Sequence, residues 1–359
     1  MNKVTEEQVL QVLKKIEDPD LHADIVSLGF VRDVRICEGN VALEIRLTTP
    51  ACPVKEKMQG DAVAAVRAIP GVTEVNVKMT AEVKQHKGLD TGALKGVRNI
   101  VAIGSGKGGV GKSTVSANVA VAFALEGARV GLLDADIYGP SIPTMMGMQG
   151  ETTVRENLIQ PKIAHGLKFM SMGFFAPGDQ PLIWRGPMAH RALEQSLTDV
   201  EWGELDYLFV DLPPGTGDVH LTLVQTVPLT GAVIVSPPQD VGLMISMKTL
   251  RMLQETNVKI LGIVENMSYH ICSHCGSREE IFGHGGVKTA SEKLGIPFLG
   301  EIPLDTSIRI KADEGVPIVA SLPESPSAKI YREIVRKLAA QISIANYSAQ
   351  KLEVVEEPA

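Results

Sequence analysis

The first 83 residues alternate between helical and strand-like hydrophobic patterns, which predicts a small α+β domain. Thr5 and Gln8 have the spacing of a capping box, so a helix is expected to begin there. A second helix is expected over residues 54–69. Two strands are expected where apolar residues alternate with polar ones, at Val41, Leu43, Ile45 and Leu47 and again at Val75, Val77 and Met79. Residues 84–97 contain three glycines and no clear period, so we assign them to a linker.

From residue 98 the pattern changes to short, nearly continuous apolar runs separated by helical stretches. These runs are the expected strands, at residues 100–103, 130–133, 167–172, 207–210, 232–235, 260–264 and 298–302. Strands that are apolar throughout are typical of a parallel sheet covered by helices on both faces. Ser325 and Pro326 predict the start of a last helix. We therefore assign residues 98–343 to an α/β domain and residues 344–359 to an acidic tail.

A glycine-rich segment directly after the first of these strands matches the phosphate-binding loop G-x-x-x-x-G-K-[ST]. Its residues are Gly106, Lys107, Gly108, Gly109, Val110, Gly111, Lys112, Ser113 and Thr114. The N–H groups of such a loop and of the following helix hold nucleotide phosphates, and Lys112 is expected to reach the β- and γ-phosphates. Ser113 is expected to ligate Mg²⁺ through its hydroxyl, and Thr114 to contact the α-phosphate. The position between a strand and a helix argues against an ordinary glycine-rich turn.

Lys107 is a second lysine in a loop that needs only one. If it faces away from the phosphates that the loop already holds, it needs another anion. The nucleotide of a neighbouring subunit would provide one, so the loop predicts a homodimer. Lys107 and Lys112 are both expected to be catalytic.

Carboxylates and a glycine follow two other expected strands, at the edge of the sheet where ligands bind. Asp134 is expected to orient magnesium waters or Lys112, and Asp136 to orient the attacking water as a catalytic residue. One of the two could instead cap the following loop. Asp211 fits an outer-shell magnesium carboxylate, and Gly215 lies in a segment whose N–H could sense the γ-phosphate. A rigid proline turn is the alternative for that segment.

Cys272 and Cys275 form the C-x-x-C of the chain, and no second pair exists. Two thiolates are half of a four-ligand metal site, and a symmetric dimer would supply the other half. Three chemical uses stay open: a bridging 4Fe–4S cluster, a zinc site, and a redox dithiol, with a silent pair as the fourth possibility. The histidines that could complete a zinc site are His270, His274 and His284.

The other two cysteines lie in the first domain. Cys52 lies between two prolines at an expected helix start, where the helix N-terminus would lower the thiol pKa. It is a candidate transient cluster ligand, or only a small residue at a tight turn. Cys37 lies in an expected strand and is expected to be packed.

Length and composition narrow the class of protein. A chain of 359 residues exceeds a typical single core, which favours two domains. The 35 basic and 42 acidic residues give a net charge of −7 without a basic tract, which argues against nucleic acid as a partner. The first residues do not resemble a signal peptide, and no apolar run reaches membrane-spanning length, so no membrane partner is expected. Four cysteines are too few for a disulfide scaffold and favour the reducing cytoplasm.

The nucleotide motifs resemble the deviant Walker A class of P-loop ATPases. The signature lysine of that class acts across a dimer interface, and Lys107 corresponds to it. The same resemblance implies that Asn266, Pro303 and Asp305 contact adenine. Asn266 could equally be a satisfied polar residue that ends a strand.

Three further segments look like the Mrp/ApbC (Nbp-type) family: residues 134–141, residues 211–218, and residues 265–268 before the C-x-x-C. The resemblance covers about residues 98 to 340. The first domain resembles the PaaD/SufT-like module of iron–sulfur assembly through residues 28–30 and 48–53.

The resemblance implies an ATP-hydrolysing homodimer that shares a 4Fe–4S cluster between two subunits and delivers it to apoproteins. A ParA/MinD-like spatial-organising ATPase and a zinc-binding regulatory ATPase are the alternatives. The acidic balance and the C-x-x-C oppose the first of these.

Overall fold

The computed structural model describes residues 4–86, 94–137, 139–175, 186–215, 223–224 and 226–356. The chain divides into two compact units, Met1–Lys84 and Gln85–Ala359. Half of the linker predicted over residues 84–97, residues 87–93, lies outside the described residues. Each unit is described by itself below.

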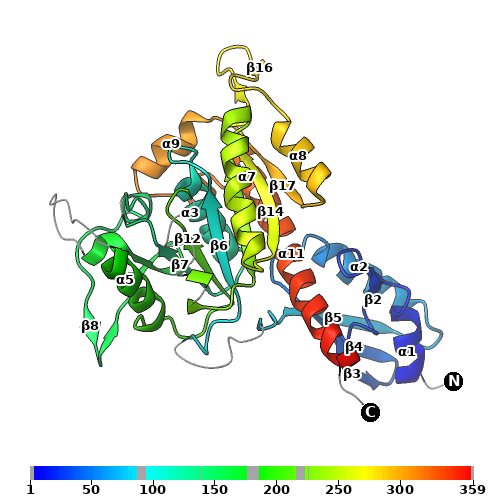
Figure 1. Cartoon of the computed structure of the whole chain (residues 1–359). Helices are drawn as coiled ribbons and strands as arrows, with labels where there is room; N and C mark the ends of the chain where they lie inside the picture. The colour runs from blue at the N-terminus through cyan, green and yellow to red at the C-terminus, as the bar shows by residue number, and fades with distance from the viewer. Residues whose placement is uncertain are drawn as a thin grey trace. The chain divides into compact units, whose positions relative to one another are not determined.

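The first unit is a three-stranded sheet with two helices. Its elements are α1 (Glu6–Leu13), β1 (Glu17–Asp18), β2 (Ala23–Asp24), β3 (Val31–Cys37), β4 (Asn40–Leu47), α2 (Lys55–Arg67) and β5 (Glu74–Ala81) (Figure 1). The strand order is β3-β4-β5, with β3 and β4 antiparallel and β4 and β5 parallel. The α+β character predicted for this region is confirmed.

Local sequence explains these elements. The Thr5 side chain accepts a hydrogen bond from the Gln8 N–H, and the Gln8 side chain accepts one from the Thr5 N–H, which completes the predicted capping box. Along β4, residues 41, 43, 45 and 47 are all buried. They form one core with the buried faces of α1 and α2.

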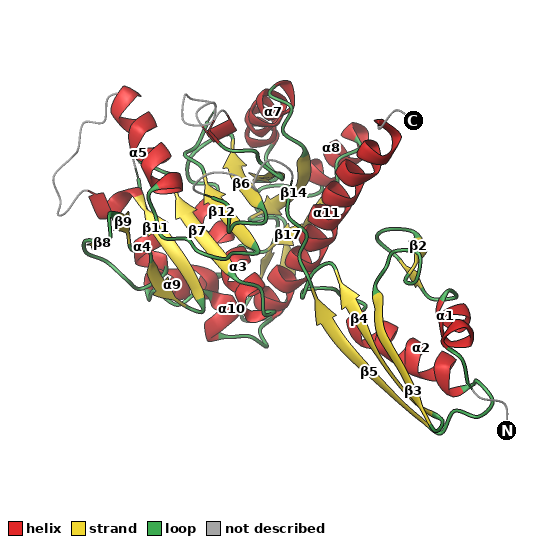
Figure 2. Ribbon diagram, turned by 90° about the horizontal axis from the view of Figure 1, so that it is seen from below, coloured by secondary structure: helices red, strands yellow, loops and turns green. Residues whose placement is uncertain are grey.

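The second unit is built around one large sheet (Figures 1 and 2). Up to its fourth large strand, the elements are β6 (Ile100–Ser105), α3 (Lys112–Leu125), β7 (Val130–Asp134), α4 (Ile142–Met145), β8 (Val154–Arg155), β9 (Leu158–Ile159), β10 (Lys162–Ala164), β11 (Leu167–Ser171), η1 (Met172–Phe175), α5 (Gly186–Thr198) and β12 (Tyr207–Asp211). The remaining elements are β13 (Gly231–Ser236), α7 (Asp240–Glu255), β14 (Ile260–Asn266), β15 (His270–Ile271), β16 (Arg278–Glu279), α8 (Gly286–Leu294), β17 (Phe298–Ile302), α9 (Thr306–Asp313), α10 (Ile318–Ser321) and α11 (Pro326–Glu356).

The sheet has the order β10-β11-β7-β12-β6-β13-β14-β17. Only the pair β10–β11 at one edge is antiparallel, and every other pair is parallel. Helices α3 and α11 pack together on one face, while α7 and α8 pack together on the other, as Figure 2 shows for α3 and α7. This arrangement confirms the predicted parallel-sheet fold. The short strands β8, β9, β10, β15 and β16 carry too few residues for a periodic signal, and sequence reasoning missed them.

The last helix is longer than the sequence assignment. A tail was predicted from residue 344, but α11 continues to Glu356. The reason is that the buried face persists past the predicted boundary, because Ile342, Ala345 and Asn346 are all buried. In the described part of the chain, no helix combines the length and the apolar composition needed to cross a bilayer.

An aromatic cluster fixes the helix that follows the phosphate loop. The ring of Phe123 in α3 lies 4.7 Å from that of Tyr207 and 5.1 Å from that of Phe209, centroid to centroid. Both partners belong to β12, and all three rings are buried. Because β12 ends at Asp211, this packing places the start of α3 beside the carboxyl end of β12.

We expect the buried side chains of β12 to determine the stability of the second unit. Leu208 is fully buried, so Leu208→Ala should lower the free energy of unfolding by about 3 kcal/mol through lost burial and a cavity. Leu125 of α3 is 53% exposed, and Leu125→Ala is the matched control with little expected effect. Urea unfolding measures both, and equal losses for the two variants would contradict this account of the core.

Candidate functional site

The glycine-rich loop joins β6 to α3 at the carboxyl end of the sheet. Gly109 and Gly111 both have positive φ, 77° and 79°, which glycine adopts without strain. Gly106 has a different constraint, since a Cβ there would lie 2.5 Å from backbone atoms of Ile245 and Ser246 in α7. The loop therefore needs its first glycine for close packing and the later ones for its turns.

The buried carboxylate of Asp211 organises the start of α3. Its side chain is inaccessible to solvent and lies 2.7 Å from Lys112 Nζ. It also accepts hydrogen bonds from the hydroxyls of Ser113, at 2.6 Å, and Ser116, at 2.5 Å. The structure thus brings together three of the predicted residues. Sequence reasoning missed Ser116, although its place one helical turn after Lys112 puts it on the same face of α3.

Asp134 lies beside Asp211 because β7 and β12 pair in parallel with these two residues in register. The Asp134 carboxylate is buried and accepts hydrogen bonds from the Ser171 hydroxyl, at 2.9 Å, and from the N–H of Ile142, at 3.2 Å. Burial, together with the charge of Asp211, raises the pKa of Asp134 to about 7. Asp136 is partly exposed and accepts a hydrogen bond from the Gly139 N–H.

The side-chain oxygens at this site suit a magnesium ion. Mg²⁺ prefers oxygen ligands in near-octahedral geometry. The Ser113 hydroxyl and the Asp211 carboxylate supply oxygens beside Lys112, and Asp134 supplies further carboxylate oxygens on the neighbouring strand.

Lys107 and Gly215 flank the loop. Lys107 is partly exposed, with its carbonyl accepting a hydrogen bond from the Ser105 hydroxyl and its Cε lying close to Gly242 of α7. The Gly215 N–H, expected to sense a γ-phosphate, donates to the Ser105 carbonyl at 2.9 Å. Residues 216 and 217 of the same predicted segment lie outside the described residues. The proposed roles of both residues stay predictions.

The three residues expected to contact adenine differ in their surroundings within the protein. The Asn266 amide donates a 2.8 Å hydrogen bond to the carbonyl of Val110 in the phosphate loop. Pro303 is buried. Asp305 caps α9 by accepting from the Ser307 N–H and also accepts from the Ser327 hydroxyl. Their contact with adenine stays a prediction.

Cys272 and Cys275 lie in the turn of the hairpin that β15 and β16 form. The Gly276 N–H donates to the Cys272 carbonyl and the Cys272 N–H to the Ser277 carbonyl, both at 2.9 Å. Cys272 is half-buried and Cys275 is exposed. The Ser277 hydroxyl and N–H, with a smaller contribution from Cys272, lower the pKa of Cys275. The turn therefore carries two free thiols, and the lowered pKa of Cys275 makes its thiol ionise more readily than an ordinary cysteine.

The two cysteines of the first unit differ from their predictions. Cys37 was expected to be packed but is exposed, because it ends β3 at the edge of the small sheet. Cys52 was expected to have a lowered pKa from a helix N-terminus. Helix α2 begins only at Lys55, and burial raises the pKa of Cys52.

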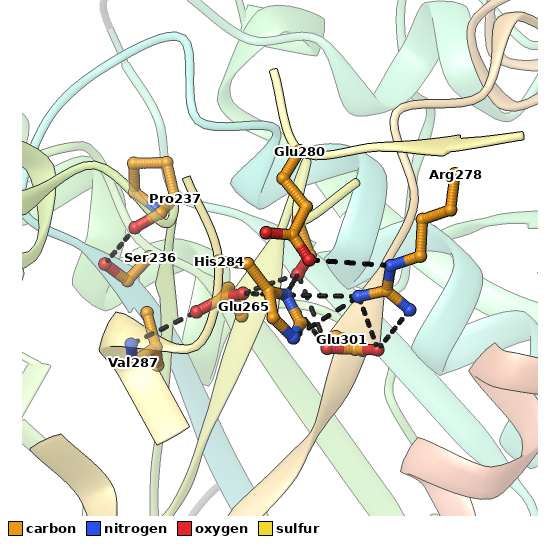
Figure 3. A network of polar contacts seen from close by, with 9 residues as sticks. Ser236, Pro237, Glu265, Arg278, Glu280, His284, Val287 and Glu301 are labelled. Carbon is orange, nitrogen blue, oxygen red and sulfur yellow. Dashed lines mark hydrogen bonds and ion pairs between the residues drawn. The ribbon is translucent and has the colours of Figure 1, made fainter. Parts of the chain in front are cut away.

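A polar network that sequence reasoning did not identify lies beside the cysteine hairpin (Figure 3). It contains Glu265 at the end of β14, Arg278 in β16, His284 and Glu301 of β17. His284 was a candidate zinc ligand in the sequence, and its Nδ1 lies 3.5 Å from a Glu301 oxygen. The available signal was Glu265 itself, a carboxylate at the end of an otherwise apolar strand.

The phosphate loop, the buried Lys112–Asp211 pair and the parallel sheet together define a P-loop NTPase. Family profiles agree with that class and refine it. The profile of the family described as "NUBPL iron-transfer P-loop NTPase" matches residues 96–339, and a profile described as "Iron-sulfur cluster assembly protein" matches residues 6–77. The chain belongs to the NUBPL iron-transfer P-loop NTPase family, which confirms the resemblance inferred from its motifs.

Relatives named for iron–sulfur cluster handling match most of the chain. The iron–sulfur cluster carrier protein of Synechocystis sp. is 50% identical, over 95% of this chain and 99% of its own. The protein of the same name from Escherichia coli is 41% identical, over 93% and 91%. The iron–sulfur cluster transfer protein NUBPL of Dictyostelium discoideum is 48% identical, over 72% and 81%.

Solved structures match the second unit's fold. A nucleotide-binding protein from Archaeoglobus fulgidus, in complex with ADP and with cobalt found in it, is 41% identical with a TM-score of 0.56. The match covers 62% of this chain and 88% of that one. The cell division ATPase MinD of Pyrococcus furiosus has a TM-score of 0.52 at 24% identity, covering 67% and 98%, and shares the fold.

We expect Asp134 to make stability depend on pH in the nucleotide-free protein. Its folded pKa of about 7 lies above the ordinary 3.8, so between these values the folded state keeps a proton that the unfolded state releases. Stability should therefore fall as pH rises through this window, by roughly 1 kcal/mol per pH unit from this group. Asp134→Asn should remove that component.

Urea unfolding of both proteins at several pH values between 4 and 7.5, in the presence of a chelator, checks this expectation. Asp136→Asn removes a neighbouring carboxylate and is the control. A difference in unfolding free energy between wild type and Asp134→Asn that does not change with pH would contradict the assignment.

Proposed function

We propose that this protein is an ATP-hydrolysing iron–sulfur cluster carrier. In this proposal, a homodimer holds a 4Fe–4S cluster between Cys272 and Cys275 of its two subunits and transfers the cluster to apoproteins. The observation that carries the proposal is the exposed hairpin with two free thiols, which lies on a P-loop NTPase scaffold. The printed names of the relatives support the same function.

The nucleotide half of the proposal starts from the Lys112–Asp211 pair. Nucleotide phosphates bring negative charge to the loop, so the Lys112 ammonium can exchange its contact with Asp211 for the β- and γ-phosphates. The Ser113 hydroxyl and Asp211 would hold Mg²⁺, which neutralises charge on the phosphate oxygens when bound. The N–H groups at the start of α3 complete the phosphate site.

Hydrolysis develops negative charge around the γ-phosphate, which catalytic groups must stabilise. Lys107 from the partner subunit would stabilise the charge that develops there, as a cation supplied in trans does in related phosphoryl transfers. Asp136 is the proposed residue that orients the attacking water, and Gly215 the proposed sensor of the γ-phosphate. Asn266, Pro303 and Asp305 are the proposed adenine contacts.

The cluster half of the proposal follows from thiol count and exposure. A 4Fe–4S cluster takes four thiolates, and the second unit of each subunit offers only Cys272 and Cys275. Two copies of the hairpin would complete the set at a twofold axis. The exposure of Cys275 suits a cargo that must leave for an apoprotein.

The domain organisation supports a role in iron–sulfur cluster assembly. We place a PaaD/SufT-like domain at residues 1–83, a linker at 84–97 and the ATPase domain from residue 98, with its last helix α11 extending past residue 343 to Glu356. The expected partners are apo iron–sulfur proteins and cluster donors in the cytoplasm, without nucleic acid or membrane. The match of residues 6–77 to an iron–sulfur assembly profile supports the first of these expectations.

We expect Cys272→Ala with Cys275→Ala to abolish cluster binding. Anaerobic reconstitution of the wild type should give an iron–sulfur absorption band and about two irons per chain, since one 4Fe–4S cluster would serve two chains. The matched control, Cys37→Ala with Cys52→Ala, removes the two thiols of the first unit and should keep the cluster. A full cluster in the first variant would reject the site, and zinc in place of iron would favour a zinc-binding regulatory ATPase.

We expect Lys107→Ala to lower ATP hydrolysis by about a thousandfold, the order observed when a trans-acting cation is lost. Nucleotide affinity should change little, because Lys112 and the loop N–H groups remain. Steady-state hydrolysis and equilibrium nucleotide binding measure the two effects separately. Lys329→Ala removes an exposed lysine of α11 as a control, and unchanged turnover of Lys107→Ala would reject the trans role.

A further inference from the structure

The cysteine hairpin is small, so contacts with other segments of the second unit must hold it in position. Each of its strands, β15 and β16, has only two residues, and short isolated hairpins are marginally stable. The first strand is held at its base, where the Leu304 N–H donates to the Tyr269 carbonyl and His270 Nδ1 lies 3.0 Å from the Leu304 carbonyl. These contacts join the hairpin to the turn after β17.

Arg278 attaches the second strand. Its guanidinium lies 3.8 Å from the ring centre of Tyr269 and pairs with Glu301 at 3.3 Å. The same group lies 3.1 Å from Nδ1 of His284 (Figure 3). Arg278 follows Cys275 by three residues, and Tyr269 precedes Cys272 by three, so this one contact closes the base of the thiol loop.

The network continues inward from Arg278 to a buried carboxylate. The Ser268 hydroxyl lies 3.2 Å from His284 Nδ1 and 3.5 Å from a Glu301 oxygen, and it donates to Glu265 at 2.5 Å. Glu265 is fully buried and also accepts from the Val287 N–H, at the start of α8. A buried carboxylate needs such partners, so its position is tightly fixed.

The residue after Glu265 reaches the phosphate loop. Asn266 donates to the Val110 carbonyl, and a Cβ on Gly111 would overlap the Asn266 amide nitrogen. Met267, between Asn266 and Ser268, has φ of 59°, an uncommon conformation for a residue with a side chain. The strained residue thus separates a contact with the phosphate loop from a contact with the hairpin network.

Glu265, His284 and Glu301 converge within 4.8 Å, as the ligands of a metal ion would. Two of these three residues already face a cation, the guanidinium of Arg278. It pairs with Glu301 and lies 3.1 and 3.3 Å from the two ring nitrogens of His284. The cluster is better explained as an ion-pair network than as a metal site.

We propose that Arg278 is a positioning residue for the two cluster thiols. Through Ser268, Glu265 and Asn266, its contacts make the position of the hairpin depend on what the phosphate loop holds. A loop that tightens around phosphates moves the Val110 carbonyl, and the buried side chains transmit that shift because they have no room to absorb it. The proposal rests on the function proposed above, and it names the residues that couple the two sites.

Thiol alkylation of the full-length, cluster-free protein tests this coupling. The rates for Cys272 and Cys275 are measured by peptide mass spectrometry, with the exposed Cys37 as internal reference, without nucleotide and with Mg-ADP or a non-hydrolysable Mg-ATP analogue. In the wild type, nucleotide should change the hairpin rates by about fivefold. In Arg278→Gln, which loses both the charge and the fork, nucleotide should leave the rates unchanged.

Two further variants separate positioning from general damage. Arg278→Lys keeps the charge without the planar fork and should recover part of the nucleotide dependence. Arg309→Gln breaks an exposed pair with Asp313 on α9 and should behave as wild type. Glu301→Gln should also abolish the nucleotide dependence of the thiol rates. The double variant with Arg278→Gln should behave like either single variant, because both substitutions remove the same Arg278–Glu301 ion pair.

Wild-type dependence in Arg278→Gln would overturn the proposal, as would a wild type whose thiol rates ignore bound nucleotide. Loss of the dependence in Arg309→Gln would also overturn it. The assay contains no iron, so its outcome is independent of the reconstitution experiment. A failed reconstitution with intact coupling would reject the cargo, whereas a normal cluster with no coupling would reject only the role of Arg278.

Discussion

The ion pair between Lys112 and Asp211 is the interaction on which the nucleotide site depends. Both side chains are almost completely buried, and the carboxylate is also bonded to two hydroxyls of α3. A buried pair of this kind contributes little net stability, because desolvation offsets most of the attraction. Its value is geometric, because it fixes the first turn of α3 against the end of β12. The aromatic contacts of Phe123 maintain the same alignment from the other end of α3.

Unlike the buried Lys112–Asp211 pair, the cysteine hairpin lies at the surface. Its thiols are exposed, and its short strands have little hydrophobic support of their own. Polar contacts of Arg278, Glu301 and the buried Glu265 hold the hairpin in place of hydrophobic packing. A site held by polar contacts at the end of rigid strands can be displaced without disturbing the core. That property suits a proposed carrier, whose cargo must be both held and released.

The sequence predicted the long strands, the capping box and the phosphate loop because each has a local signal. Apolar runs identify the buried strands, and glycine spacing identifies the loop. The register that brings Asp134 beside Asp211 is a property of strand pairing, so sequence could suggest the pair but not its shared burial. Arg278, His284 and Glu301 come from three separate segments and have no motif. Cys37 was assigned wrongly because a strand pattern does not distinguish an edge strand from a central one.

Two features of the chain would both be completed by the proposed partner subunit. Lys107 is a second lysine in a loop whose Lys112 is the proposed phosphate ligand, and Cys272 with Cys275 would be half of the proposed four-thiolate set. Each feature alone has another explanation, since a spare lysine can be solvated and two thiols can bind zinc with histidine. His284 is engaged with Arg278 at both ring nitrogens, whereas His270 uses Nδ1 on the Leu304 carbonyl, which leaves its Nε2 to face a metal. A symmetric dimer supplies the missing anion and the missing thiolates together, so it explains both features with one assumption.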